Sequence, residues 1–142
     1  MTFLLDTNII SEISKPKPDA AVVEWLLANR GRCALSVITL AEMRHGIERL
    51  PESRKKSALE TRFQFVTEDY AEQFYEFDGA AAHEWGRYAA ELEAEHGADW
   101  WKRFDFRDTQ IAATAREYGL TIATRNTAHF PFCDVVNPFK AE

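Results

Sequence analysis

The first constraint on the fold is a short apolar run, Phe3-Leu4-Leu5, that stops abruptly at the polar residues Asp6-Thr7-Asn8. A run of this length predicts a buried β-strand that delivers a polar cluster to its carboxyl end. Open parallel sheets bind their ligands at the carboxyl ends of the strands. We therefore expect Asp6 to mark the functional edge of a sheet.

The remainder of the chain alternates between segments with helical and strand-like patterns. Apolar spacing, capping residues and prolines predict helices over residues 8–14, 19–30, 36–50, 52–68, 78–97 and 108–119. Short apolar runs predict further strands over residues 33–35, 74–77, 120–124 and 134–136. The segment 98–107 has no clear period and is expected to be a loop. Strands that alternate with helices indicate the α/β class, with a parallel sheet covered by helices on both faces.

Individual caps and buried positions follow from the same spacing. Asp19, Ser36 and Asp78 are the expected N-caps of three helices, and Gly119 is the expected end of the last one. The expected inward-facing positions are Val22, Val23, Leu26 and Leu27 in the second helix, Leu40, Met43, Ile47 and Leu50 in the third, Ala82, Trp85, Ala89 and Leu92 in the fifth, and Ile111, Ala112 and Ala115 in the last. Around the axis of the third helix, Glu42 lies about 100° from these apolar residues, so we expect it at the rim of the buried face.

Length and composition indicate one compact unit. A chain of 142 residues with 46% hydrophobic residues predicts a single domain, residues 1–142, with a substantial core. No apolar run approaches the roughly 20 residues that span a bilayer, and the start MTFLLD lacks a basic segment, so a protein of the cytoplasm is expected. Cys33 and Cys133 lack the spacing of a zinc site or a disulfide framework and are expected to be buried free thiols.

The charge balance limits the ways in which the chain can bind nucleic acid. Seventeen Lys and Arg residues against twenty-three Asp and Glu residues give a net charge of −6, which argues against broad electrostatic binding. A nuclease remains compatible with this charge, because a cluster of carboxylates can bind a cation, and the cation then binds a phosphate of the nucleic acid.

Three acidic residues share one position relative to the expected sheet. Asp6 ends the first strand, Glu42 lies early in the helix after the second, and Asp108 lies at the start of a late helix. Taken singly, each acid is more often a cap or a solvated residue than a catalyst. Together, clustered carboxylates require a cation, and oxygen donors without His or Cys select Mg²⁺ or Mn²⁺ over zinc. Thr124 and Asn126 would add neutral oxygens to the same edge.

Four motifs carry a resemblance to a known family. They are LLDTNIISE at the N-terminus, LSVITLAEMRHGIE in the third helix, RDTQIAATAREYGLTIATRN towards the end, and VVNPF near the C-terminus. In order and spacing, these motifs resemble the PIN-domain ribonucleases, and within them the VapC and FitB type toxins of toxin–antitoxin pairs. The similarity spans nearly the whole chain, whereas residues 52–97 match only in their helical character.

The resemblance implies a fold, a reaction and a set of site residues. The implied fold is a small three-layer α/β/α sandwich with a mainly parallel sheet, and the implied metal ligands are Asp6, Glu42 and Asp108. The fourth polar position of the catalytic site falls on Asn126. Relatives often have an acid there or three residues on, where this chain has His129, so the number of bound metals stays open.

The implied reaction is hydrolysis of RNA phosphodiester bonds assisted by Mg²⁺, with Mn²⁺ as the alternative cation. Thr7 and Asn8 would orient Asp6 or contact the phosphate, and Ser36 would act from the adjacent strand end. Capping and turn chemistry explain these three residues equally well. The other histidines, His45, His83 and His96, lie on predicted helices without a second ligand four residues on.

The segment Trp100–Arg107 interleaves aromatic and basic residues directly before Asp108. Such a composition is typical of surfaces on which RNA bases stack, with Lys102, Arg103 and Arg107, together with Arg125, as candidate phosphate contacts. Packing in the core or in a dimer is the alternative explanation, and we expect it for at least half of the aromatic residues.

The resemblance also implies partners. Toxins of this type pair with a small, VapB-like antitoxin whose C-terminal segment covers the active site, and they commonly form homodimers. A competing function is a non-catalytic PIN-like module that binds RNA or protein without cleavage, which loss of the acids would indicate. A haloacid-dehalogenase-like phosphatase would need a second Asp two residues after Asp6, where this chain has Asn8.

Overall fold

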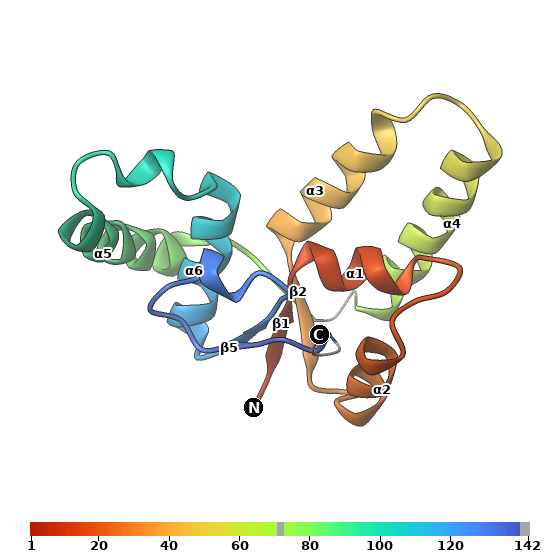
Figure 1. The fold of residues 1–142 in the computed structure, drawn as a ribbon, viewed down its shortest axis with the longest axis horizontal. Coiled ribbons are helices and arrows are strands. Elements are labelled where there is room, and N and C mark those ends of the chain that lie inside the picture. Colours follow the sequence, from red (N-terminus) through yellow and green to blue (C-terminus); the bar gives the residue numbers. More distant parts are fainter. Residues whose placement is uncertain (71–72, 140–142) are drawn as a thin grey trace.

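A five-stranded, fully parallel sheet forms the centre of the structure, a computed structural model that describes residues 1–70 and 73–139 (Figure 1). Its strands are β1 (Phe3–Leu5), β2 (Cys33–Ser36), β3 (Phe74–Tyr75), β4 (Thr121–Ala123) and β5 (Val135–Val136). Their order in the sheet is β3-β2-β1-β4-β5, so β1 is the central strand and its carboxyl end lies between those of β2 and β4. The predicted α/β class and parallel sheet are confirmed.

Helices cover both faces of the sheet because side chains alternate along each strand. Leu4 of β1 packs into a core with α5 (Gly79–His96) and α6 (Phe106–Tyr118). Its neighbour Leu5 packs into a second core on the opposite face, with α1 (Thr7–Ile13) and α2 (Ala20–Ala28). The implied three-layer sandwich is therefore present.

The remaining pair of helices extends the second layer. They are α3 (Val37–Glu48) and α4 (Arg54–Asp69), which pack on each other and rise beyond the edge of the sheet in Figure 1. Met43 of α3 and Val66 of α4 reach the same core as Leu5. No helix in the described part of the chain is long and apolar enough to cross a membrane.

The predicted helix N-caps are confirmed, whereas the predicted start of the last helix is wrong. Asp19, Ser36 and Asp78 each accept a hydrogen bond from a backbone N–H in the first turn of the following helix. The expected loop over 98–107 instead contains a short 3-10 helix, η2 (Trp100–Lys102), and the first residues of α6. The helix starts early because Asp105 is its N-cap, with Oδ1 2.8 Å from the backbone N of Arg107.

Some predicted core positions are wrong. In α5, Ala89 and Leu92 are buried as predicted. Ala82 is exposed, however, and Ala81 and Tyr88 are buried, so the inward face at the start of the helix includes Ala81 instead of Ala82. Leu27 of α2 is 58% exposed.

Of the four core residues predicted for the third helix, only Ile47 is buried, and Leu50 lies beyond the end of α3. Leu40 and Met43 are half-buried and line grooves, although α3 contacts α1, α4 and α6. Both cysteines are free, as predicted, although Cys133 is only partly buried.

Candidate active site

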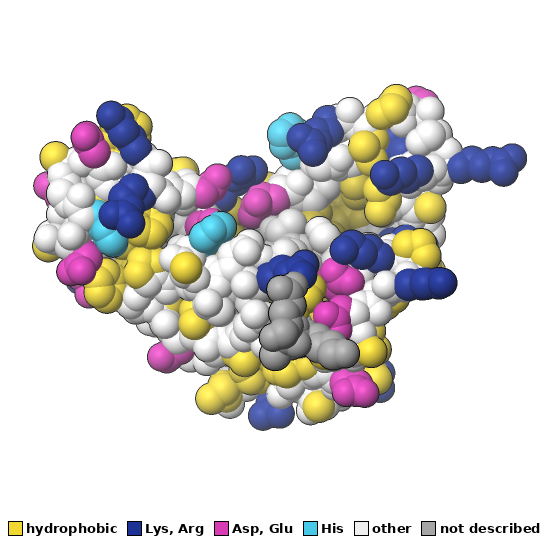
Figure 2. All heavy atoms as spheres, in the orientation of Figure 1, with side chains coloured by type: hydrophobic (Ala, Val, Ile, Leu, Met, Phe, Trp, Pro, Cys, Tyr) yellow, Lys and Arg dark blue, Asp and Glu magenta, His cyan; other side chains and the backbone are white. Residues whose placement is uncertain are grey.

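An acidic cleft of about 500 Å³ lies at the carboxyl edge of the sheet. In Figure 2 the acids and a histidine gather in the hollow between the two raised parts of the molecule. The residues that line the cleft are Asp6, Thr7, Asn8, Ser11, Glu12, Lys15, Glu42, Asp105, Asp108, Arg125, Asn126, His129 and Phe139. The three acids expected at one edge of the sheet therefore line one cleft.

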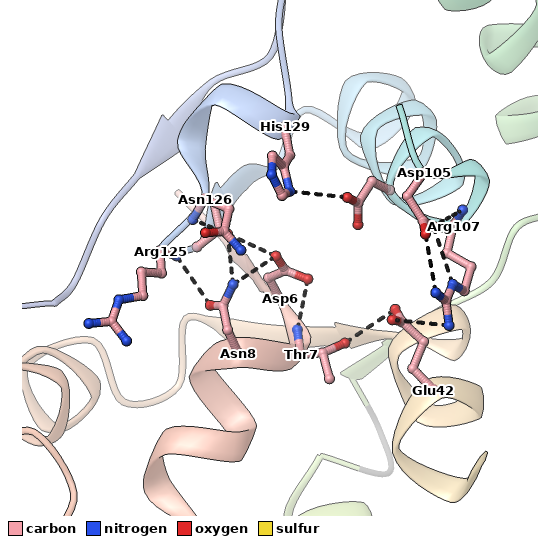
Figure 3. Close-up of polar contacts among 11 residues, drawn as sticks. Asp6, Thr7, Asn8, Glu42, Asp105, Arg107, Arg125, Asn126 and His129 are labelled. Carbon is pink, nitrogen blue, oxygen red and sulfur yellow. Dashed lines mark hydrogen bonds and ion pairs between the residues drawn. The ribbon is translucent and has the colours of Figure 1, made fainter. Parts of the chain in front are cut away.

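Asp6 is the buried centre of the cleft (Figure 3). It follows β1 and caps α1, with Oδ1 accepting a 2.8 Å hydrogen bond from the backbone N of Thr7. Its other oxygen, Oδ2, accepts hydrogen bonds from Thr124 Oγ1 at 2.8 Å and from Asn8 Nδ2 at 3.2 Å. Burial raises the pKa of Asp6 above its usual value, although these hydrogen bonds and His129 oppose the rise.

Thr124 links the ends of two neighbouring strands. Its Oγ1 donates to Asp6 and accepts from Asn8 Nδ2 at 3.2 Å and from the backbone N of Asn126 at 3.0 Å. Asn8 Oδ1 in turn accepts a 3.1 Å hydrogen bond from the backbone N of Arg125. These contacts fix the start of α1 against the loop after β4, and so set the orientation of the Asp6 carboxylate.

Glu42 enters the cleft from α3, on the rim of that helix as predicted. Its Oε1 accepts a 3.2 Å hydrogen bond from Thr7 Oγ1, and its Oε2 lies 3.8 Å from Arg107 Nη1. Burial raises the pKa of Glu42, an effect that the Arg107 guanidinium reduces and the charge of Asp6 reinforces.

Asp108 faces Asp6 from the first turn of α6. Burial, followed by the negative charges of Asp6 and Asp105, raises the pKa of Asp108 to about 7. Its Oδ2 lies 3.4 Å from His129 Nδ1, and this contact lowers the pKa in part.

Asp105 was not singled out by the sequence pattern, yet it lines the cleft. Besides capping α6, it holds the Arg107 side chain through contacts of 3.2 Å from Nε and 3.1 Å from Nη2. The positively charged Arg107 guanidinium therefore contacts both Asp105 and Glu42 (Figure 3). The sequence feature that could have identified Asp105 is its position three residues before Asp108, which places the two acids on the same turn of a helix.

Five candidate residues lie outside the lining of the cleft. Thr124 and Arg107 contact residues of the lining, whereas Ser36, Lys102 and Arg103 do not. Ser36 is fully buried, and its Oγ accepts the capping hydrogen bond from the backbone N of Ile38 at 3.0 Å. Lys102 and Arg103 lie on the exposed segment beyond the cleft, where Lys102 Nζ stands 5.4 Å from the centre of the Trp101 ring. Trp100 and Phe104 pack against the core, whereas Trp101 is exposed, which agrees with the expectation that about half of these aromatic residues are structural.

The donor atoms in the cleft suit a hard divalent cation. Asp6, Glu42 and Asp108 offer carboxylate oxygens, and burial raises the pKa of all three, so a bound cation would favour their ionised forms. In the described part of the chain, no three His, Cys, Asp or Glu side chains stand in position around one point as a metal shell. A cation in this cleft would draw the three carboxylates closer together and would compete with Arg107 for Glu42.

Comparison with known proteins identifies a family and similar sequences. The PIN domain family profile matches residues 3–135. Toxin FitB of Neisseria gonorrhoeae is 37% identical over 140 residues, which cover 96% of this chain and 97% of that protein. The tRNA(fMet)-specific endonuclease VapC of Shigella flexneri is 36% identical over 132 residues, 92% of this chain and 90% of that protein.

Solved structures with the same fold come from toxin–antitoxin complexes. The chain is similar to one in FitAB bound to a DNA fragment, with a TM-score of 0.87 and 34% identity over 99% of this chain and 98% of the other. It is also similar to one in FitAcB from Neisseria gonorrhoeae, with a TM-score of 0.82 and 35% identity over 96% and 98% of the two chains.

Proposed function

The chain belongs to the PIN domain family, and we propose that it is the toxin of a toxin–antitoxin pair, a metal-dependent endoribonuclease of the cytoplasm formed by a single domain. The observation that carries this proposal is that Asp6, Glu42 and Asp108, from three separate elements, line one cleft at the carboxyl edge of the sheet. Relatives of nearly the same length are named ribonuclease, endonuclease and toxin.

Within the cleft, Asp6, Glu42 and Asp108 would hold a divalent cation, which we propose to be Mg²⁺, with Mn²⁺ as the alternative. A bound cation of this kind supplies a water of lowered pKa and neutralises charge on the phosphate. The chain's own part is to orient the ligands. Thr7, Asn8 and Thr124 fix Asp6 by hydrogen bonds, and Asn126 occupies the fourth, uncharged position of the site.

We assign RNA binding to basic residues around the acidic centre. Arg125 lines the cleft, and Arg107 contacts two of its acids, Glu42 and Asp105. Lys102 and Arg103 extend the basic surface along the exposed segment beside α6. Because the chain as a whole carries a charge of −6, phosphates are attracted only where these groups are concentrated.

A groove beside the cleft supports the antitoxin assignment. It has a volume of about 730 Å³, lies between α1, α3 and α4, and has an apolar floor that includes Ile10, Met43 and Phe63. Thr7, Ser11, Lys15 and Glu42 line both the groove and the cleft, so a peptide that lies in the groove reaches the acids. A basic side chain of a VapB-like antitoxin would there replace the cation. We also propose that the toxin forms a homodimer.

The test is cleavage of a single-stranded RNA by the purified protein with Mg²⁺ or Mn²⁺. We expect cleavage that EDTA abolishes and that Asp6→Asn abolishes while the variant stays folded. Cleavage that survives EDTA would refute the metal mechanism. RNA binding without cleavage under any divalent cation would instead favour the non-catalytic module.

A further inference from the structure

His129 is the one imidazole among the residues that line the acidic cleft. Its Nδ1 lies 3.4 Å from Asp108 Oδ2, and the ring lines the same cleft as Asp6 (Figure 3). Asn126, the residue at the fourth corner, carries no charge. Arg125, beside Asn126, has no lone pair to offer a cation, so His129 is the strongest ligand that this loop brings to the cleft.

A fixed turn presents the His129 ring to the cleft. The 3-10 helix η3 (Thr127–His129) follows Asn126, whose backbone N is bound to Thr124 Oγ1 and whose carbonyl accepts from the backbone N of His129 at 3.0 Å. The next residue, Phe130, is 1% exposed and anchors the turn in the core below α6. The ring itself is half exposed.

The spacing between His129 and Asp108 fits two ligands of one cation. Adjacent ligands of an octahedral ion, each about 2.1 Å from it, lie roughly 3.0 Å apart. The observed separation of 3.4 Å between Nδ1 and Oδ2 closes to that value with a small rotation of either side chain. A direct ion pair between a protonated His129 and Asp108 uses the same geometry and is the alternative that the test must exclude.

We propose that His129 is a nitrogen ligand of the divalent cation held by Asp6, Glu42 and Asp108. The inference rests on the proposed function, because it requires a cation at those acids. Imidazole favours first-row transition ions, whereas carboxylates and water also accept Mg²⁺. The site therefore discriminates more strongly in favour of Mn²⁺ over Mg²⁺ than the same three acids with an oxygen ligand at position 129.

The test uses the full-length, metal-free protein with Mn²⁺ as the probe and no RNA. Pulsed electron paramagnetic resonance detects the coupling of bound Mn²⁺ to an imidazole nitrogen. We expect this coupling in the wild-type protein and in His45→Ala, an exposed histidine on α3. We expect its loss in His129→Gln, with Mn²⁺ still bound. In His129→Asp, the preference for Mn²⁺ over Mg²⁺ in calorimetric titration should fall by about tenfold.

The role of His129 and the existence of the acidic metal site can be refuted separately. Mn²⁺ that binds in an Asp6-dependent manner without nitrogen coupling, or an unchanged Mn²⁺ to Mg²⁺ preference in His129→Asp, would overturn the role of His129 and leave the acidic metal site intact. Mn²⁺ binding that Asp6→Asn does not affect would overturn both. Circular dichroism of His129→Gln confirms that the variant is folded.

Discussion

Thr124 Oγ1 donates a 2.8 Å hydrogen bond to Asp6 Oδ2 across 118 positions of sequence. The bond joins the carboxyl ends of β4 and β1, which are neighbours in the sheet. Because both residues are buried, the contact is shielded from water and fixes the orientation of the carboxylate on which the site depends.

Replacing Thr124 by Val removes this hydroxyl with little change in volume. Asp6, Asn8 and the backbone N of Asn126 each lose a partner, so we expect the free energy of unfolding to fall by about 1–3 kcal/mol. Urea denaturation measures the change. Thr124→Ser keeps the hydroxyl and should recover most of the loss, and equal destabilisation by Ser and Val would contradict the assignment to the hydrogen bond.

Arg107 competes with a cation for Glu42. Its Nη1 lies 3.8 Å from Glu42 Oε2, in a pair whose arginine is half exposed. Since such a pair contributes about 0.2–1 kcal/mol, Arg107→Gln should tighten Mn²⁺ binding by a factor of roughly 1.4 to 5 in calorimetric titration. Arg103→Gln, outside the cleft, is the matched control and should leave the affinity unchanged. Weaker Mn²⁺ binding by Arg107→Gln would show that Arg107 supports the metal site instead.

Asp108 should make the metal-free protein less stable as the pH rises. Its pKa is about 7 in the folded chain against an ordinary value of 3.8, so the folded state retains a proton that the unfolded chain has lost. This contribution is complete below about pH 4 and disappears as the pH rises through about 7. Asp6 and Glu42 shift in the same direction.

Urea denaturation in EDTA at several pH values tests this effect. We expect Asp108→Asn to reduce the decline in the free energy of unfolding with rising pH. Asp134 is an exposed acid at the opposite edge of the sheet, and Asp134→Asn should leave this decline unchanged. A wild-type protein that gains stability between pH 4 and 7, by an amount that Asp108→Asn removes, would contradict the raised pKa.

Local patterns predicted the scaffold of the site well. The apolar run before Asp6, the caps Asp19, Ser36 and Asp78, and the rim position of Glu42 follow from interactions within a few residues, which sequence spacing records. The bond between Asp6 and Thr124 does not, because it depends on which strands become neighbours.

The segment around Asp105 was predicted less well, for a different reason. Its aromatic residues have no helical period, so the capping role of Asp105 was hidden and α6 was expected to begin two residues late. The error at the start of α5 has a similar origin. Alanines at 80, 81 and 82 leave the apolar face of the first turn without a distinct register, and in the structure Ala81 is the buried one.

The basic segment beside α6 should contribute to RNA affinity. In the Asp6→Asn background, which is expected not to cleave, Lys102→Ala with Arg103→Ala should weaken binding of a labelled single-stranded RNA. If each side chain meets one phosphate, the slope of log affinity against log salt should fall in magnitude by about 1.4. Fluorescence anisotropy measures both quantities.

The charge-matched control for this experiment is Arg30→Ala with Arg32→Ala, before β2 at the opposite edge of the sheet. This variant has the same net charge as the Lys102 and Arg103 double variant and should bind RNA like its parent. An equal loss in both double variants would mean that overall charge, and no specific surface, governs RNA binding.

The central claim is that Asp6, Glu42 and Asp108 together hold the catalytic cation. Crystals soaked in Mn²⁺ test it most directly through the anomalous scattering of the ion. We expect an anomalous peak in the cleft within ligating distance, about 2.0–2.4 Å, of carboxylate oxygens of Asp6, Glu42 and Asp108. A Mn²⁺ peak elsewhere on the protein, with these carboxylates unliganded at saturating Mn²⁺, would contradict it.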